Sequence, residues 1–348
     1  MQFKNEIKRL QINDLTANNL WDKFVFTNPD ATFFHRAGWQ RVINISFGHA
    51  TYFLYIEVAG VIHGILPLAH VKSTLFGNSL ISLPFAVYGG IVAINIDMFI
   101  LLEQAAQDLA HKLNVDHLEF RNQKQQHNDW PTQNIYVSFQ KNIFLTEEEN
   151  FLAIPRKQRA MVRKGMKNGL SSSVEITIDN FFKLYANNVH RHGTPALSRK
   201  YFSALIEEFG KDCEILTIFS NSGHPLSSVF SFYFRDEVLP YYAGDDLSAR
   251  DLSANDFKYW ELMRRACLSG LKTFDYGRSK VNTGSFAFKK NWGFEPKSLS
   301  YEYCLFKKNL IPQNNPSNKK YKLLINIWKR LPISIANTLG PYVVKNLG

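Results

Sequence analysis

A cluster of basic side chains is the first feature of this sequence that could do chemistry. No acidic residue occurs between Phe151 and Val174, a range that contains Arg156, Lys157, Arg159, Arg163, Lys164 and Lys167. A solvated basic helix is the simplest interpretation. Like charges at this density repel one another, however, unless a polyanion or an acidic surface faces them. Because a charge-assisted hydrogen bond is worth about 1.5–3 kcal/mol, the segment is predicted to be a helix that binds phosphate groups.

A second candidate is the segment FDYGRSKVNTGSFAFKKNWGFEP, residues 274–296. Asp275 ends a predicted strand, and Ser279 lies in the loop beyond it. Loops at strand ends are where ligands bind in α/β folds. An aromatic core turn with incidental lysines is the alternative. An anion site is favoured because this stretch, otherwise rich in buried residue types, also carries Arg278, Lys280, Lys289 and Lys290.

The third candidate is LPYYAGDDLSARDLSANDFKYWELMRRA, residues 239–266. Tyr241 and Tyr242 end a predicted strand and should point to opposite faces, so at most one of them lines a site. Asp245 follows in the loop. Asn255 or Asp256 is expected to cap the next helix, which is a more ordinary role for Asn255 than catalysis.

Metal and disulfide chemistry are not expected. Cys213, Cys267 and Cys304 are widely spaced, with no C-x-x-C pair, which suits a reducing compartment. His190 and His192 have no neighbouring ligand cluster, so a helix-end role is expected for them. The net charge of +11 instead predicts an anionic partner: nucleic acid, a phosphorylated substrate or the inner membrane surface.

Hydrophobic periodicity predicts an α/β chain in which one order of elements occurs twice. In each half a strand rich in Tyr and Gly leads into a long amphipathic helix and then into a short acidic strand. The predicted domains are residues 1–148, residues 149–310 with the reacting site, and a basic, apolar helical tail at 311–348. A stretch of about 18 apolar residues and a signal-peptide pattern are both missing, so a cytoplasmic protein is expected.

The tail combines the apolar residues Leu324, Ile327, Trp328 and Leu331 at helical spacing with a second basic group: Lys319, Lys320, Lys322, Lys329 and Arg330. One interpretation is peripheral contact with an anionic inner membrane. The other is a C-terminal helix docked on the preceding domain.

These motifs resemble the Fem-like (FemAB) acyltransferases, which are tandem GNAT-fold proteins. The family's R-x-x-I-x-x-A-x-K-x-G helix is matched in spacing, with glycine in place of alanine, by Arg159, Val162, Gly165, Lys167 and Gly169. Its F-K-x-x-F-G turn is matched, with tryptophan in place of phenylalanine, by Phe288, Lys289, Trp292 and Gly293.

The sequence is still more similar to the Fem-like proteins associated with the exosortase/PEP-CTERM system of exopolysaccharide-producing bacteria. The resemblance runs from about residue 30 to the C-terminus. It includes the strings FGHATYFLYIE, LPFAVYGG, IPRKQRAMVRKG, SFYFRDEVLPYYAG, ANDFKYWELMRRA, FDYGRSK and GSFAFKKNWGFEP.

The resemblance implies two GNAT-like domains with mixed, mostly antiparallel sheets flanked by helices. It also implies N-acyl transfer to an amine in cell-envelope or exopolysaccharide-linked metabolism. Fem ligases take an aminoacyl group from tRNA to a UDP-linked precursor, so a phosphate-bearing substrate, and tRNA as a partner, are implied. No permanently bound cofactor is expected, and acyl-CoA or aminoacyl-tRNA is the co-substrate. The loop SARDLSAND has no glycine, which argues against ordinary acetyl-CoA binding there.

The expected reaction is direct attack of an amine on an activated ester or thioester, which needs positioning, a proton acceptor and oxyanion donors. Lys289 and strand-edge N–H groups are the expected oxyanion donors, and Asp275, Asp245 or the substrate itself is the expected proton acceptor. The full candidate set is Lys289, Asp275 and Tyr242 for catalysis, with Arg159, Arg163, Lys167, Arg278, Ser279, Lys290 and Asn255 for substrate or phosphate.

Two rival functions remain open at this point. One is acyl-CoA-dependent transfer to a sugar or amino acid. The other is a non-catalytic module that binds a phosphorylated glycolipid or nucleic acid through the same cations.

Overall fold

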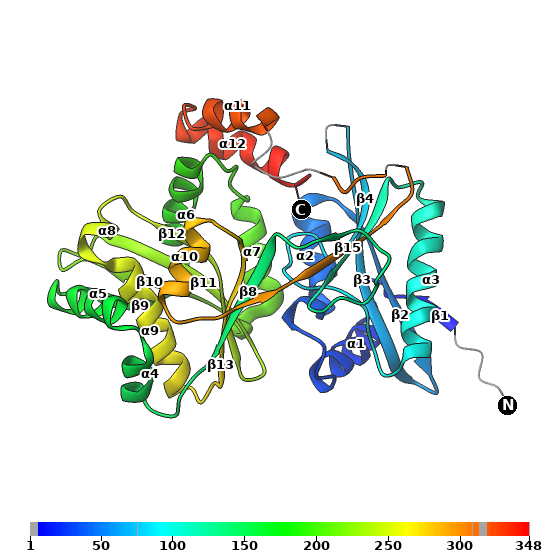
Figure 1. Ribbon diagram of the computed structural model, residues 1–348, viewed down its shortest axis with the longest axis horizontal. Coiled ribbons are helices and arrows are strands. Elements are labelled where there is room, and N and C mark those ends of the chain that lie inside the picture. Colours follow the sequence, from blue (N-terminus) through cyan, green and yellow to red (C-terminus); the bar gives the residue numbers. More distant parts are fainter. Residues whose placement is uncertain (1–5, 75, 308, 313–318, 348) are drawn as a thin grey trace. The chain divides into compact units, whose positions relative to one another are not determined.

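The computed structural model describes residues 6–74, 76–307, 309–312 and 319–347, which form two compact units. The first unit contains residues 1–136, 298–314 and 345–348, and the second contains residues 137–297 and 315–344. Each unit has one sheet flanked by helices (Figure 1). The predicted α/β fold with mixed sheets and a C-terminal helical tail is therefore confirmed.

The first unit is built on a sheet with the strand order β1-β2-β3-β4-β6-β15-β7, to which β5 adds by pairing with β3. Its strands are β1 (Glu6–Arg9), β2 (Ala50–Val58), β3 (Val61–Ser73), β4 (Gly77–Ser82), β5 (Val92–Ala93), β6 (His117–Asn122), β7 (Thr132–Gln133) and β15 (Ser300–Leu305). Its helices are α1 (Leu15–Thr27), the 3-10 turn η1 (Phe33–His35), α2 (Gly38–Phe47) and α3 (Ile96–Lys112).

Helices cover both faces of this first sheet. Neighbouring residues of a strand point to opposite faces. Leu54 of β2 packs with Leu102 of α3, whereas the preceding Phe53 stacks on Trp21 of α1. Strands β2 and β3 form a hairpin, in which Ala59 and Gly60 both have positive φ, as a tight turn between twisted strands requires.

The second unit is built on a seven-stranded sheet with the order β14-β8-β13-β12-β11-β10-β9. Its strands are β8 (Tyr136–Asn142), β9 (Ser171–Glu175), β10 (Cys213–Phe219), β11 (Pro225–Phe234), β12 (Glu237–Asp245), β13 (Thr273–Lys280) and β14 (Pro296–Ser298). Its helices are α4 (Glu147–Ala153), α5 (Arg156–Lys167), α6 (Asp179–His192), α7 (Arg199–Phe209), the 3-10 turn η2 (Gly210–Asp212), α8 (Ala249–Leu252), α9 (Ala254–Leu268), α10 (Gly284–Asn291), α11 (Lys319–Trp328) and α12 (Ile333–Val344).

The long helix α9 covers one face of the second sheet. Its predicted apolar face is confirmed, because Trp260 and Met263 are buried in one cluster with Val229 of β11. The next residue of β11, Phe230, points to the other face, where it meets Phe202 of α7. Helix α9 ends at Leu268, with Gly270 in the left-handed region just beyond it, as is common where helices end.

Both units contain a parallel strand pair joined through a helix, which agrees with the duplicated order of elements. In the first unit β4 pairs in parallel with β6 after α3, and in the second β12 pairs in parallel with β13 after α9. Parallel strands need such a crossover connection, since a tight turn can join only antiparallel strands.

Each sheet contains one strand whose position in the sequence would suggest the other sheet. Strand β15 follows β13 in the chain, yet it pairs with β6 of the first unit. Strand β8 follows β6, yet it lies beside β13 in the second sheet. The contact-based units are consequently discontinuous, whereas the predicted domains 1–148 and 149–310 are continuous segments. That domain division stays a prediction.

Candidate functional site

The parallel strands β12 and β13 pair only at their beginnings. Glu237 lies opposite Thr273 and Val238 lies opposite Phe274, although the strands continue to Asp245 and Lys280. Beyond these two positions the strands part inside the sheet. The carboxyl ends of parallel strands are where ligands bind in α/β folds, and a parted pair offers backbone amides to an extended ligand.

A buried ion pair marks the end of β12. The Lys258 ammonium, on α9, is fully buried and donates to Asp245 Oδ1 at 3.1 Å. The hydroxyl of Ser227, on β11, donates to the same oxygen. The Asp245 side chain is 29% exposed, so it is the partner in this pair that a ligand can reach.

The first turn of α9 adds a second carboxylate to this region. Asp256 accepts a hydrogen bond from Trp292 Nε1 at 2.9 Å, and burial raises the pKa of the Asp256 carboxyl. Tyr259, one turn along, packs edge-on to Tyr276 of β13 with ring centroids 4.8 Å apart. Burial and the charges of Asp245 and Asp256 raise the pKa of Tyr259, so its hydroxyl stays neutral. The end of β12, the start of α9 and the end of β13 thus form a polar cluster with aromatic walls.

The predicted cap of α9 is wrong. Helix α9 begins at Ala254 with Ser253 as its N-cap, and Asp256 bonds to Trp292 instead of capping. Ser253 has φ near 60°, a left-handed conformation that usually favours glycine. Asn255 lies half-buried in the first helical turn, where N–H groups have no partner within the helix. Its expected role in substrate binding stays a prediction.

Tyr241 and Tyr242 do not point to opposite faces. The β11–β12 register pairs Phe230 with Tyr242 and then Ser231 with Pro240, which leaves Tyr241 as the extra residue of a β-bulge. Both tyrosine rings therefore pack together, with centroids 4.8 Å apart. The Tyr242 hydroxyl lies 2.8 Å from that of Tyr201, on α7.

Burial raises the pKa of Tyr242 well above its ordinary value, so this hydroxyl belongs to an internal aromatic cluster. The contacts described for the Tyr242 side chain are with other aromatic residues and not with Asp245 or Lys258. Its expected role in catalysis stays a prediction.

Lys289 is buried and points into the end of β13. Its ammonium donates to three successive backbone carbonyls, those of Tyr276 at 2.7 Å, Gly277 at 3.2 Å and Arg278 at 3.1 Å. Burial lowers the pKa of Lys289 to about 7, with Asp275 acting to raise it and Arg278 to lower it. Three carbonyl acceptors match the three N–H donors of the protonated amine, so this geometry favours the charged form that burial disfavours. This geometry describes a residue that positions the 276–278 segment, and the expected contact with a reacting carbonyl stays a prediction.

Asp275 is also committed to structure. It is 1% exposed and accepts hydrogen bonds from Gln140 of β8 at 2.9 Å and from the Gly277 N–H at 2.7 Å. Gly277 has positive φ, and the Asp275 side chain holds that turn. Of the two aspartates considered as proton acceptors, the one with solvent access is therefore Asp245.

The other candidates of this segment lie around the same turn. The buried Ser279 hydroxyl is 2.7 Å from that of Ser285, which ties β13 to α10. Arg278 is half-buried. Lys290 is exposed, with its ammonium 5.9 Å from the centre of the Phe286 ring.

The basic segment forms the predicted helix, α5, and packs on α9. Val162 and Gly165 face α9, and a methyl group at Gly165 would lie only 2.9 Å from Phe257 Cβ, so glycine permits this close approach. Arg163 and Lys167 are exposed, and the Arg163 guanidinium lies 5.2 Å from the Phe151 ring centre. Arg159 is half-buried, and within the described part of the chain its Nε atom has no hydrogen-bond partner.

The two basic segments meet at one point only. Pro155, which precedes α5, lies against Gly293, which follows α10. Arg159 is one turn into α5, whereas Lys167 is about 12 Å further along the helix axis, from the rise of 1.5 Å per residue. The Lys289 ammonium is directed into β13 and not toward this junction. The contact between the two basic segments thus lies beside the first turn of α5.

A cavity of about 460 Å³ in the second unit lies elsewhere, beside β10 and the later part of α9. Three of its polar side chains bond to one another: Tyr233 donates to Glu214 at 3.1 Å, and Arg265 donates to Glu214 at 2.8 Å. Because these charges are already paired, the chemistry of this cavity is less suited to a charged ligand than the end of β12.

The first unit has a cavity of about 380 Å³ at the carboxyl end of β6. Buried polar residues line this cavity, and their hydrogen bonds are already made within the protein. Arg121 donates to Glu119 on the same strand and to the carbonyls of Leu83 and Ala86 in the loop after β4. His35 hydrogen-bonds the Gly90 carbonyl at 3.0 Å. These groups build the wall of the cavity.

Metal binding is not indicated in the part of the chain that the structure describes, where no cluster of three potential ligands occurs. The three cysteines are unpaired by disulfides, as predicted. Across the described residues, no helix combines the length and the apolar character that crossing a bilayer requires.

Lys258 is the residue that sequence reasoning missed. It sits between Phe257 and Trp260 on an otherwise buried stretch of α9, and a charged residue in that setting is rarely buried without a partner. A lysine at that position, together with Asp245 and Asp246 at the end of the preceding strand, indicates a buried ion pair in the sequence itself.

Comparison with known proteins agrees with this geometry. Residues 156–290, which span α5 to α10, match the acetyltransferase (GNAT) domain family. This segment contains β12, β13 and the Asp245–Lys258 pair, so the second unit carries a GNAT-type acyltransferase domain. A search of curated protein sequences gave no match.

Several solved structures share the fold over most of the chain. FemX is 14% identical, with a TM-score of 0.66 over 87% of this chain and 98% of its own. The C-terminal domain of a putative lysylphosphatidylglycerol synthetase from Agrobacterium fabrum is 10% identical, with a TM-score of 0.56 over 84% and 93%. A tandem GNAT protein from the clavulanic acid biosynthesis pathway is 13% identical, with a TM-score of 0.55 over 87% and 98%. The predicted tandem GNAT-like fold is therefore confirmed.

Proposed function

We propose that this protein is an N-acyltransferase that moves an acyl or aminoacyl group from an activated ester or thioester to an amine. The observation that carries the proposal is the partly exposed Asp245 carboxylate, held by the buried Lys258 at the point where β12 and β13 part. This arrangement lies in the segment that matches the GNAT domain. It supplies a proton acceptor next to backbone groups that can hold a substrate in extended form.

The proposed step is direct transfer without a covalent enzyme intermediate. The acceptor amine attacks the donor carbonyl, and a new C–N bond forms as a tetrahedral oxyanion appears. Asp245 takes the proton that the attacking amine loses. The C–S or C–O bond to the donor then breaks, and the proton passes to the leaving thiolate or alkoxide. Backbone N–H groups beside the parted strands are the proposed oxyanion donors.

The donor is proposed to bear phosphate groups. The GNAT fold accommodates acyl-CoA, and aminoacyl-tRNA is the alternative donor suggested by the resemblance to Fem ligases. Arg163 and Lys167 are exposed on α5, next to the start of α9, where Asn168 donates to the Leu252 carbonyl at 3.2 Å. Cations in this position suit the phosphates of either donor.

The acceptor is proposed to belong to cell-envelope or exopolysaccharide-linked metabolism. Support comes from the sequence resemblance to the exosortase-associated Fem-like proteins. FemX and a lysylphosphatidylglycerol synthetase domain also appear among the structures that share the fold. An acyl-CoA-dependent transfer to a sugar or amino acid is tested by the same experiment.

The test compares donors and acceptors directly. The purified chain is incubated with labelled acetyl-CoA, longer acyl-CoA thioesters or aminoacyl-tRNA, each with amino sugars, amino acids or UDP-linked amino sugars. Products are identified by mass spectrometry. Formation of an amide with one donor class supports the proposal and selects the donor. Tight binding of donors with no turnover would instead identify a non-catalytic binding module.

Asp245→Asn is the decisive variant. We expect transfer to fall by roughly 10²–10⁴-fold, the usual contribution of a general base. The substitution also leaves Lys258 buried without its counter-ion, which costs about 3–5 kcal/mol.

The double variant Asp245→Asn/Lys258→Met removes that buried charge and separates the two effects. It should recover most of the lost melting temperature but not the activity. Asp251→Asn, at an exposed position of α8, is the matched control. Recovery of activity along with stability in the double variant would show that Asp245 is structural only.

A further inference from the structure

The two C-terminal helices of the second unit are fixed to it by one side only. Ile325 of α11 packs against Gly193, where an added Cβ would collide with it, and the carbonyl of Trp328 is 3.1 Å from the His190 ring. On α12, Ala336 is buried, and Gly340 lies against the Ala196 backbone. These contacts involve α6 and the turn after it, so α11 and α12 hold a defined orientation on the unit that carries the GNAT domain.

Both helices also carry large apolar side chains that are open to solvent. Five large side chains are between 45% and 68% exposed: Leu324, Ile327, Ile335, Leu339 and Tyr342. Leu324 and Ile327 are spaced i, i+3 on α11, and the other three are spaced i, i+4, i+7 on α12, so each set forms one helical stripe. Scattered exposed apolar residues are ordinary, but apolar stripes on two consecutive helices mark an interaction surface.

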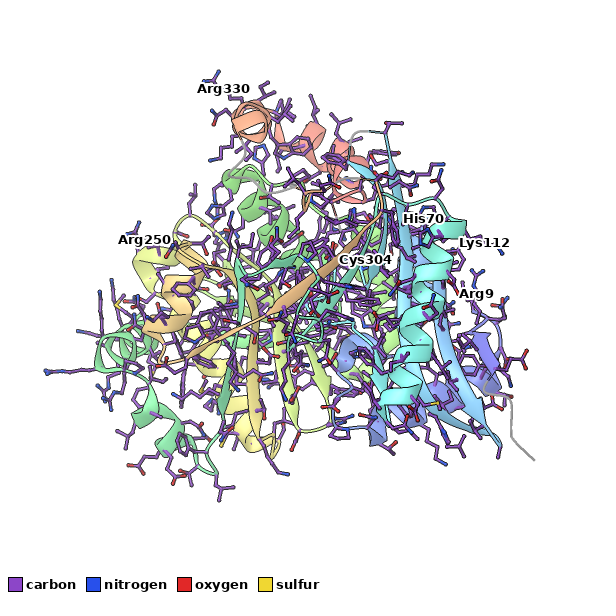
Figure 2. The ribbon with its side chains drawn as sticks, turned by 45° about the vertical axis from the view of Figure 1, so that its right-hand side comes forward. Arg9, His70, Lys112, Arg250, Cys304 and Arg330 are labelled. Carbon is purple, nitrogen blue, oxygen red and sulfur yellow. The ribbon has the colours of Figure 1, made fainter. Side chains whose placement is uncertain are left out.

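The charged residues of the C-terminal segment all have the same sign. Residues 311–348 contain six basic residues and no acidic one. Lys329 and Arg330, in the turn between the helices, are exposed, and Figure 2 shows Arg330 at the end of α11. Residues 331–344, which include all of α12, carry no charge. An apolar stripe bordered by cations is the pattern of helices that lie in the interface of an anionic membrane.

We propose that α11 and α12 form a peripheral binding surface for a bilayer of anionic lipids. The apolar stripes enter the acyl boundary, and the cations meet lipid phosphates. A second copy of the chain fits this surface less well, because a two-fold contact would bring the cations of both copies together. The inference goes beyond the proposed transfer reaction and does not depend on it, and it would place that reaction next to membrane-bound acceptors.

The experiment uses the full chain and vesicles of phosphatidylcholine, with and without phosphatidylglycerol, in a sedimentation assay that contains no acyl donor. We expect binding to the anionic vesicles and weaker binding at high salt, because salt screens the cations. Two variants test the two parts of the surface: Ile335→Gln/Leu339→Gln removes apolar contact, and Lys329→Gln/Arg330→Gln removes charge. Each should weaken binding by roughly tenfold or more.

Matched controls come from exposed residues elsewhere in the second unit. Ile176→Gln removes an exposed apolar side chain, and Lys200→Gln removes an exposed cation on α7. Neither should change vesicle binding, and melting temperatures verify that every variant folds.

Three results would overturn the proposal. They are absence of binding to anionic vesicles, equal binding by all variants, and a dimer that the Ile335→Gln/Leu339→Gln variant dissociates in light scattering. Since the assay measures binding alone, its outcome is independent of whether acyl transfer is found.

Discussion

Lys289 shows how a cation from a recognisable motif can serve the fold around a site. Its ammonium gathers the carbonyls of residues 276, 277 and 278, which a regular strand would direct to alternating sides. Gly277 makes this possible through its positive φ, and Asp275 fixes the same turn from the other side. The residue therefore shapes the end of β13, next to the aromatic wall of the candidate site.

Replacing Lys289 with alanine should lower stability as well as activity. The change leaves three carbonyls at a buried position without a donor, and we expect a loss of about 3 kcal/mol in the free energy of unfolding. Thermal denaturation measures this loss. Lys290→Ala, one residue on and exposed, should melt like the parent chain. If Lys289→Ala lost activity with an unchanged melting temperature, a direct role in the reaction would be restored.

At the scale of elements, the loop after β6 is held by one histidine. The His127 ring lies 3.1 Å from Glu103 of α3 and 3.5 Å from Glu302 of β15, and it stacks on Trp130 at 4.0 Å. Burial acts to lower the pKa of His127, but the hydrogen bond to Glu103 and the nearby charge of Glu302 outweigh it and raise the pKa to about 9. The protonated ring thus joins a helix, a loop and a strand that are far apart in sequence.

This network predicts a pH-dependent stability. The pKa of His127 rises from 6.5 in the unfolded chain to about 9 in the fold. Its stabilisation is therefore complete below about pH 6.5 and is lost as the pH rises through about 9. We expect His127→Gln to lower the free energy of unfolding by about 2–3 kcal/mol at pH 6, and to have much less effect at pH 10. Melting temperatures measured at both pH values check this expectation.

His111→Gln is the control, since His111 is an exposed residue of α3. A difference between His127→Gln and the parent chain that stays constant from pH 6 to pH 10 would contradict the assigned charge.

At the scale of the whole molecule, each sheet includes a strand from beyond the predicted domain boundary at residue 148. Strand β15 belongs to the first sheet, and β8 belongs to the second. Strand β15 pairs with β6 through six residue pairs, from Ser300 opposite Asn122 to Leu305 opposite His117. It also brings the fully buried Glu302, which accepts hydrogen bonds from the N–H groups of Gln126 and His127. The first unit therefore needs residues that follow the GNAT segment.

A fragment of residues 1–148, the predicted first domain, should not fold by itself. Without β15, strand β6 becomes an open edge, and the buried side chains of Arg121 and His117 lose the rings of Tyr301 and Tyr303 that pack on them. We expect no cooperative unfolding transition by circular dichroism. Residues 1–136 joined through a flexible linker to residues 298–312 should restore one. A sharp transition in the 1–148 fragment would show that β15 is dispensable.

Local pattern in the sequence was enough to determine most helices and strands. The apolar spacing of α9, its terminal Gly270, the Ala59–Gly60 turn and the basic helix α5 all follow from interactions within a few residues. The duplicated order of elements and the motif resemblance also led to the tandem GNAT-like fold. The sequence likewise marked the segments that form the site, because the end of β12, the start of α9 and the turn after β13 were all singled out.

Tertiary structure decided what each side chain does there. Lys258 becomes a partner of Asp245 only when α9 lies on the sheet, and the bulge at Tyr241 exists only in register with β11. Lys289 points into the fold because carbonyl groups of β13 accept hydrogen bonds from its side chain. Strand β15 belongs to the first sheet only because it pairs with β6. Periodicity and turn chemistry act over a few residues, whereas burial of a charge depends on which distant groups surround it.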